Sequence, residues 1–191
     1  LTGGTVGGGA SRLVALVVSL MLVSTVGWIA LRSELRARLG GFALLAVGLL
    51  SVQVMLGALT VWKLLSPAVV SSHLAVALLL FCTLLTITTG AGDAAGPGAR
   101  LPARPAGLLP LFALATALVY GQALLGGFVS TSGAALACPD WPTCNGRWLP
   151  PLDGLAGLQV IHRLGAYAVS AVMVTLALAA RGAADPRVRG G

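Results

Sequence analysis

Apolar residues fill five long runs of the chain, and short polar or glycine-rich stretches separate these runs. A helix needs about 20 predominantly apolar residues to cross roughly 30 Å of hydrocarbon. The runs that reach this length lie at approximately 13–31, 41–61, 70–89, 108–129 and 159–180. Because backbone groups in lipid must be hydrogen-bonded within their own segment, each run is predicted to be helical. The pattern predicts an all-α, polytopic transmembrane helix bundle that forms one domain over residues 1–191.

Composition agrees with a lipid-embedded chain. Hydrophobic residues make up 57% of the sequence and charged residues 9%, with a mean hydropathy of +0.96, whereas about a quarter of the residues in a soluble domain are charged. The formal net charge of +7 could suggest nucleic-acid binding, but in a membrane protein a basic excess is usually a topology signal. No nucleic-acid partner is therefore expected.

The basic residues predict the orientation of the helices. Eight of the twelve lie in the charged loop 32–40, the glycine- and proline-rich linker 90–107 and the tail 181–191. Cytoplasmic segments carry an excess of Lys and Arg. We therefore expect a multi-pass cell-membrane protein with its N-terminus and the connection between the fourth and fifth runs outside, and its C-terminus in the cytoplasm.

That outer connection contains two of the three cysteines, Cys138 and Cys144. Outside the cytoplasm a disulfide can persist, and Pro139 and Pro142 constrain the turn between the two sulfurs. A disulfide is expected, with a structural or a redox role. Zinc needs about four ligands in closely spaced pairs, so a zinc site is a less favoured alternative, as are free thiols. Cys82, in the third run, is expected to be a small buried hydrophobic residue.

The outer side also contains two carboxylates and two tryptophans of interest. Asp140 could act as a general acid or base, but a turn-forming or surface role is favoured for it, and Asp153 is the other outer carboxylate. Trp141 and Trp148 are expected at the interface between membrane and water.

The two histidines of the chain, His73 and His162, each stand four residues into a predicted span that begins at the outer face. An ionisable residue within a membrane is costly and tends to be functional. Neutral imidazole is a common metal ligand, and helix bundles hold cofactors between facing helices. Heme fits this setting because its iron takes axial imidazoles. Arg163 and Arg12 are candidates to pair with the heme carboxylates.

Two internal echoes suggest a repeat. The segment SRLVALVVSLMLV at 11–23 aligns with HRLGAYAVSAVMV at 162–174, with arginine conserved between the copies and Ser11 in place of the histidine. QVMLGA at 53–58 likewise matches QALLGG at 122–127. The small residues of the second echo would allow helices or a flat ligand to approach closely.

Three segments resemble the heme A synthase family: LGALTVWKLLSPAVVSSHL at 56–74, GQALLGGFVSTSGAALACPDWPTCNG at 121–146 and IHRLGAYAV at 161–169. Members of that family have eight helices in two four-helix halves, and the five runs here resemble the second to the sixth. The resemblance makes 1–89 a remnant of the first half, 90–107 the cytoplasmic linker and 108–191 the start of the second half. On this resemblance the family's first and last two helices are expected to have no counterpart here, as in a fragment or a shortened relative.

The resemblance also assigns site residues. Each half of the family carries a pair of heme-ligating histidines near the outer face, and His73 resembles the second ligand of the first half. His162 resembles the first ligand of the second half, while Cys138 and Cys144 resemble the cysteine pair of an outer loop. Ser11 stands where the histidine partner of His73 would be. A glutamate thought important in catalysis is replaced by Gly8, the later copy has Gln159 at the corresponding place, and no catalytic residue is assigned.

The family's activity is the oxidation of a methyl group of heme O to the formyl group of heme A, for cytochrome c oxidase biogenesis. The resemblance implies the same oxidoreductase activity here, with heme b as cofactor and heme O as substrate. Heme O and its synthase, membrane lipid, an unidentified electron donor and a second copy of the chain are the implied partners. Ser11 and Gly8, in place of the family's histidine and glutamate, favour a second hypothesis, a heme-binding assembly or electron-transfer protein that does not catalyse the oxidation. A third hypothesis is a membrane scaffold with a structural disulfide and no heme.

Overall fold

Five long α-helices make up most of the computed structural model, which describes residues 3–62, 66–94, 106–148 and 150–184. Within those ranges the side chains of residues 3–8, 10–12, 93–94, 106 and 182–184 are not described. The helices are α1 (Gly3–Leu31), α2 (Ser33–Trp62), α3 (Pro67–Ala94), α4 (Leu109–Ser132) and α5 (Gly154–Ala184). All five are long and apolar enough to span a membrane. The predicted all-α transmembrane class is confirmed.

Most of the helices extend beyond the predicted apolar runs, at one end or at both. Pro67 begins α3, where its missing N–H costs nothing because the first helical amides have no partner within the helix. Gly154 begins α5 with a φ of 60°. His73 and His162 are therefore the seventh and ninth residues of their helices, about two turns from the helix start rather than one.

The expected loop at 32–40 is wrong, because α2 already begins at Ser33. The break between α1 and α2 is confined to Arg32, whose guanidinium lies 4.7 Å from the centre of the Trp28 ring. Arg36 donates from Nη1 to the carbonyl of Ala30, 2.9 Å away, and so supplies a partner for the end of α1. Arginine, leucine and glutamate are good helix formers, so this charged segment continues as helix.

Two compact units divide the chain. The first comprises Leu1–Met55 and Val76–Arg100, and the second comprises Leu56–Ala75 and Leu101–Gly191. The division crosses α2 and α3, so that the end of α2 and the start of α3 belong with α4 and α5. The expected cytoplasmic linker at 90–107 stays a prediction, and its residues 95–105 lie outside the described ranges.

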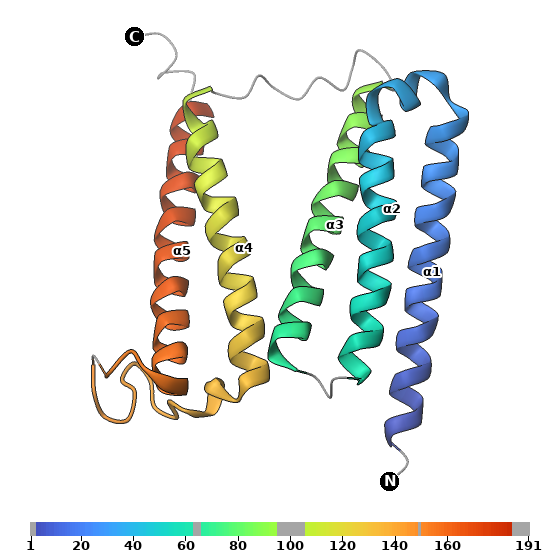
Figure 1. Cartoon of the computed structure of the whole chain (residues 1–191). Helices are drawn as coiled ribbons and strands as arrows, with labels where there is room; N and C mark the ends of the chain where they lie inside the picture. Colours follow the sequence, from blue (N-terminus) through green and yellow to red (C-terminus); the bar gives the residue numbers. More distant parts are fainter. Residues whose placement is uncertain (1–2, 63–65, 95–105, 149, 185–191) are drawn as a thin grey trace. The chain divides into compact units, whose positions relative to one another are not determined.

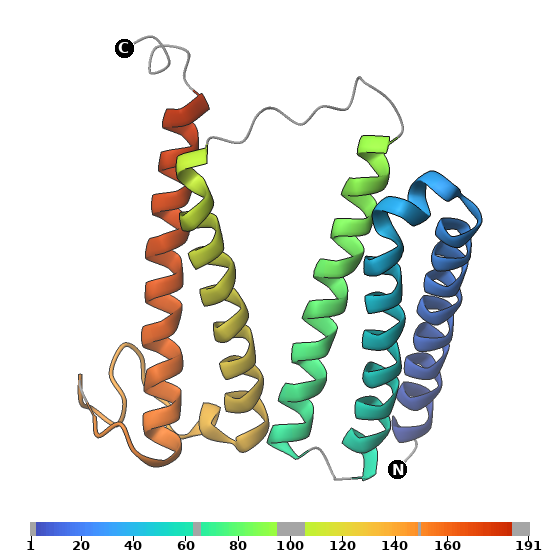
Figure 2. The ribbon, with the colours of Figure 1, turned by 45° about the horizontal axis from the view of Figure 1, so that its top comes forward.

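The first unit has an aliphatic core between α1, α2 and α3, three helices that Figures 1 and 2 show running next to one another. Its buried residues are Leu22, Ile29, Leu39, Ala43, Ala46, Leu80 and Ile87. Cys82 lies on α3 but is exposed, so its expected burial is wrong. The reason is the solvent: in a lipid-spanning helix an apolar side chain can face hydrocarbon instead of a protein core.

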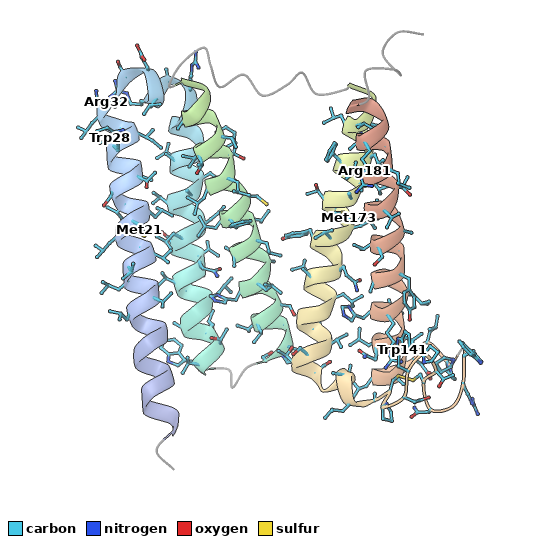
Figure 3. All side chains as sticks on the ribbon, turned by 180° about the vertical axis from the view of Figure 1, so that it is seen from behind. Met21, Trp28, Arg32, Trp141, Met173 and Arg181 are labelled. Carbon is cyan, nitrogen blue, oxygen red and sulfur yellow. A yellow bond between two sulfur atoms is a disulfide. The ribbon has the colours of Figure 1, made fainter. Side chains whose placement is uncertain are left out.

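In the second unit α4 and α5 lie side by side over most of their length (Figure 1). A connection containing the short 3-10 turn η2 (Ala134–Leu136) joins them, after α4 ends at Gly133 with a φ of 78°. Glycine adopts this left-handed conformation readily and is the usual residue for ending a helix. Figure 3 shows Trp141 in this connection beside the first turns of α5, and Arg181 at the opposite end of the helix.

Candidate functional site: the His162 cluster and the disulfide loop

His162 on α5 is held by an amide from α4. The Gln122 Nε2 atom lies 2.9 Å from His162 Nδ1 and donates to the backbone carbonyl of the same histidine at 2.7 Å. One carboxamide thus contacts both the ring and the backbone of one residue. A side chain held at two points loses most of its rotational freedom, so the direction of the imidazole is set by α4.

Two glycines make this contact possible. A Cβ at residue 126 would lie 3.0 Å from His162 Cε1, so the absence of a side chain there lets the ring rest against α4. A Cβ at residue 165 would collide with Gln122 Oε1. Gly126 makes room for the ring and Gly165 makes room for the amide. We call His162, Gln122, Gly126 and Gly165 the His162 cluster.

His73 repeats part of this arrangement. A Cβ at Gly57 would stand 3.4 Å from His73 Cε1 and 4.0 Å from Nδ1. Gly57 and Gly126 occupy the same place in the two Q-x-x-L-G segments, and each faces the histidine of the following helix. The sequence similarity between 53–58 and 122–127 is therefore accompanied by a structural similarity: in each segment a glycine packs against a histidine ring.

The start of α3 packs directly on α4. A Cβ at Gly127 would lie 3.0 Å from Leu74 Cδ2 and 3.6 Å from Ser71 Oγ. The Tyr120 hydroxyl donates to the Ala75 carbonyl at 3.3 Å. Gly126 faces α5 and Gly127 faces α3, so two consecutive residues of α4 allow close packing against the two helices that carry the histidines.

The connection between α4 and α5 is closed by a disulfide between Cys138 and Cys144, whose Cα atoms are 4.7 Å apart. This confirms the favoured alternative, and because the sulfurs are bonded to each other they are not zinc ligands. Cys138 is 3% exposed and Cys144 1% exposed, and both pack against Val160 and Ala156 of α5. We call residues 138–147 the disulfide loop.

The tip of the disulfide loop is a tight turn. Cys144 and Arg147 exchange two backbone hydrogen bonds of 2.9 and 3.1 Å across Asn145 and Gly146. Both central residues have positive φ, 52° and 73°, and Asn-Gly is the favoured pair for such a two-residue turn.

Asp140 closes the turn from within the loop. Its carboxylate accepts from the backbone amides of Asn145 at 2.7 Å and Gly146 at 2.9 Å, and from the Thr143 hydroxyl. These bonds, the Thr143 bond first, lower the pKa of Asp140 to about 2. Every observed partner of the carboxylate is a loop residue, which fits the favoured turn-forming role.

Arg163, the residue after His162, fastens the disulfide loop to α5. Its Nη1 donates to the carbonyls of Asp140 and Thr143, both at 2.9 Å, and its Nη2 donates to the carbonyl of Cys138 at 2.8 Å. The planar guanidinium suits several fixed acceptors at once. The expected pairing of Arg163 with a heme carboxylate stays a prediction. Arg12 belongs to α1, but its side chain lies outside the described ones.

Two buried polar atoms close to the histidines in sequence have no hydrogen-bond partner among the described residues. They are Gln159 Oε1, one helical turn before His162, and Ser71 Oγ, two residues before His73. A buried amide or hydroxyl without a partner is costly, so these atoms are suited to a polar group supplied by a bound molecule. The described residues contain no group of three or more His, Cys, Asp and Glu that could hold a metal ion.

Sequence reasoning identified His162, Arg163 and the cysteines, but it did not assign Gln122 or Gly165 to the site. The match between the two Q-x-x-L-G segments was the available signal for Gln122. For Gly165 the signal was its spacing, three residues after His162 on the same helix, which places both on one face.

Comparison with known proteins gives a consistent family. A model of the COX15-CtaA family, described as cytochrome oxidase assembly protein, matches residues 10–190. The chain is 32% identical over 169 residues to the heme A synthase of Symbiobacterium thermophilum, covering 85% of this chain and 55% of that protein. The heme A synthase of Methylobacterium radiotolerans is 35% identical over 166 residues, covering 74% of this chain and 43% of the relative. The chain spans about half the length of the curated relatives it matches.

Proposed function

Because this chain belongs to the COX15-CtaA family of cytochrome oxidase assembly proteins, we propose that it takes part in heme A synthesis, the oxidation of the heme O methyl group to a formyl group. The observation that carries the proposal is the His162 cluster: an imidazole on α5 held by Gln122 against the bare backbone of Gly126. Both histidines lie within helices able to span a membrane.

The residues of the second unit suit heme. Small residues let a side chain lie directly against a neighbouring helix backbone, and Gly57 and Gly126 do this for the His73 and His162 rings. The unpaired Gln159 Oε1 and Ser71 Oγ could accept or donate to polar substituents. The porphyrin supplies four nitrogens itself, so only one or two imidazoles are required from the protein.

In this proposal His162 and His73 would hold the iron, and a bound heme b would supply one-electron redox chemistry. Gln122 directs the His162 ring, and the apolar faces of α4 and α5 keep bulk water from the reacting carbon of the substrate, heme O. The disulfide loop closes the outer end of α5 as a brace, with its sulfurs buried against Val160 and Ala156. Arg163 joins that brace to the helix that carries His162.

The proposed orientation places the disulfide loop outside the cytoplasm, where a disulfide persists. Heme O would then arrive through the membrane from the enzyme that makes it. The electron donor and a second copy of the chain complete the proposed partners. The basic residues Arg32, Arg36 and Arg38 around the α1–α2 turn support this orientation.

The test is expression of the full chain with a supply of heme O, followed by chromatography of the extracted hemes. Heme A is expected with the wild-type chain and not with His162→Ala. In parallel, the purified chain in nanodiscs is titrated with hemin while the Soret band is followed. A wild-type chain that binds no hemin would exclude both heme-based functions.

One specific observation favours a second function, a heme-binding assembly or electron-transfer protein of the same family. Ser11 and Gly8 replace the histidine and the glutamate that the family pattern places in the first half. Under this alternative the chain binds hemin and His162→Ala weakens binding, yet no heme A is formed when heme O is supplied.

A further inference from the structure

The carboxamide of Gln122, on α4, contacts Nδ1 of the His162 ring. Its Nε2 lies 2.9 Å from Nδ1 and 2.7 Å from the His162 carbonyl oxygen. Both atoms of His162 are acceptors for the two amide hydrogens. Because an amide nitrogen only donates, this geometry corresponds to the tautomer with the lone pair on Nδ1 and the proton on Nε2.

The position of this carboxamide is determined by its surroundings. Gln122 and Gly126 are four residues apart, so they lie on the same face of α4. Gly165 leaves the space that Gln122 Oε1 occupies, and any Cβ there would collide with it. The ring rests on Gly126 with its Cε1 corner: Cε1, Nε2 and Nδ1 lie 3.0, 3.6 and 3.8 Å from the position a Cβ would take.

We propose that Gln122 is the positioning residue of His162, engaging Nδ1 so that Nε2 is the nitrogen available to bind iron. This inference rests on the proposed function, in which His162 is an axial ligand. A ligating histidine donates its other ring N–H to a fixed acceptor, which sets its tautomer and orientation. Gln122 carries both functions in one group, since its Nε2 donates to an unprotonated Nδ1 and its Oε1 accepts from a protonated Nδ1. When Nε2 gives up its proton to water and Nδ1 takes one up, a half-turn of the amide about its terminal bond would present Oε1 to the new Nδ1–H.

The first test needs no heme. The chain has only two histidines, so ¹⁵N-histidine NMR of the full chain in nanodiscs gives two ring spectra, and His162→Ala assigns them. The wild type is expected to show His162 with the proton on Nε2 and an Nδ1 resonance shifted by a hydrogen bond. Gln122→Met, which keeps the length and removes the amide, should lose that shift and mix the tautomers. Unchanged His162 resonances in Gln122→Met would overturn the inference.

The second test uses hemin. Loss of an outer partner of a metal-bound histidine costs about 10- to 100-fold in affinity, so Gln122→Met should bind hemin about tenfold or more weakly. Gln122→Glu keeps an acceptor for Nδ1–H, so it should retain hemin and lower the iron reduction potential, because a more basic imidazole stabilises ferric iron. Gly165→Ala should behave like Gln122→Met, since its Cβ displaces the amide.

Thr131→Val is the matched control, because the Thr131 hydroxyl bonds to the Gly127 carbonyl of its own helix. Helical content by circular dichroism should be equal in all variants. The assignment of His162 as an iron ligand fails if His162→Ala binds hemin as tightly as the wild type, or if the wild type binds none. In either case the role of Gln122 in positioning an iron ligand fails as well. If His162→Ala loses hemin while Gln122→Met and Gln122→Glu match Thr131→Val in affinity and potential, only the inference about Gln122 fails.

Discussion

His162 lies so close to Gly126 that a single methyl group at residue 126 would stand 3.0 Å from Cε1 of its ring. Few real Cβ atoms have so close a neighbour, so the ring would have to move, and with it the nitrogen that faces Gln122. The glycine therefore belongs to the site as much as the histidine does.

Gly126→Ala is expected to lower hemin affinity about tenfold or more. Overpacking a fitted contact costs about 1–3 kcal/mol, and about 1.4 kcal/mol corresponds to a tenfold change in affinity. Gly57→Ala should have a smaller effect, because its Cβ would be 3.4 Å from His73 Cε1, an ordinary contact. Gly121→Ala, with nothing within 4 Å of its Cβ, is the control. Equal hemin titrations for Gly126→Ala and Gly121→Ala would contradict the packing argument.

Arg163→Lys is expected to release the disulfide loop from α5. A lysine ammonium cannot reach the three carbonyls that the guanidinium spans, and a hydrogen bond from a charged donor contributes about 1.5–3 kcal/mol. Hydrogen–deuterium exchange of the amides in residues 138–147 should therefore rise about tenfold or more.

Arg147→Lys is the matched control for this change, since Arg147 takes part in the turn through its backbone. Equal exchange in the two lysine variants would show that the three observed bonds do not stabilise the loop.

The turn built on Asp140 should be stable at neutral pH and fail in acid. The folded-state pKa is lowered to about 2 from an ordinary value of 3.8. A lowered pKa means that the stabilisation is complete above about pH 4, declines as the carboxylate is protonated, and is lost as the pH falls through about 2. Fluorescence of the adjacent, exposed Trp141 should report a transition in this window. Asp140→Asn should abolish that pH dependence, whereas Asp153→Asn should leave it unchanged.

The Cys138–Cys144 disulfide should resist reductants while the loop is closed. Thiol–disulfide exchange requires a thiolate to reach a sulfur, and the two residues are 3% and 1% exposed. Alkylation after dithiothreitol treatment, followed by mass spectrometry, should show slow reduction in nanodiscs and fast reduction in SDS. Arg163→Lys should accelerate the reduction in nanodiscs. Fast reduction of the folded wild type would instead support a redox-exchange role for the pair.

Much of the fold could be predicted because lipid imposes a simple rule. Runs of about 20 apolar residues must be helical, and all five became helices. Helix ends were less predictable, because polar residues such as those after Arg32 can continue a helix beyond the hydrocarbon. The exposure of Cys82 was missed for a related reason, since apolar character does not distinguish a lipid-facing position from a buried one.

The sequence allowed the main site residues to be identified, but not the atoms to which they hydrogen-bond. Imidazoles and cysteines carry recognisable chemistry, so His162 and the Cys138–Cys144 pair could be selected from the sequence. That Arg163 would bind loop carbonyls, and that Gln122 would bind His162, depends on the rotation of α4 against α5. A sequence pattern specifies which face a residue occupies, not which atom it meets.

The two consecutive glycines of α4 limit how this helix can change in evolution. Successive residues of an α-helix are about 100° apart around its axis, so Gly126 packs against α5 while Gly127 packs against α3. Inserting or deleting one residue between Gln122 and Gly126 would rotate one end of this segment against the other and turn a glycine away from its histidine-bearing neighbour. Natural variants of this helix should therefore tolerate many substitutions along the segment but no change in its length.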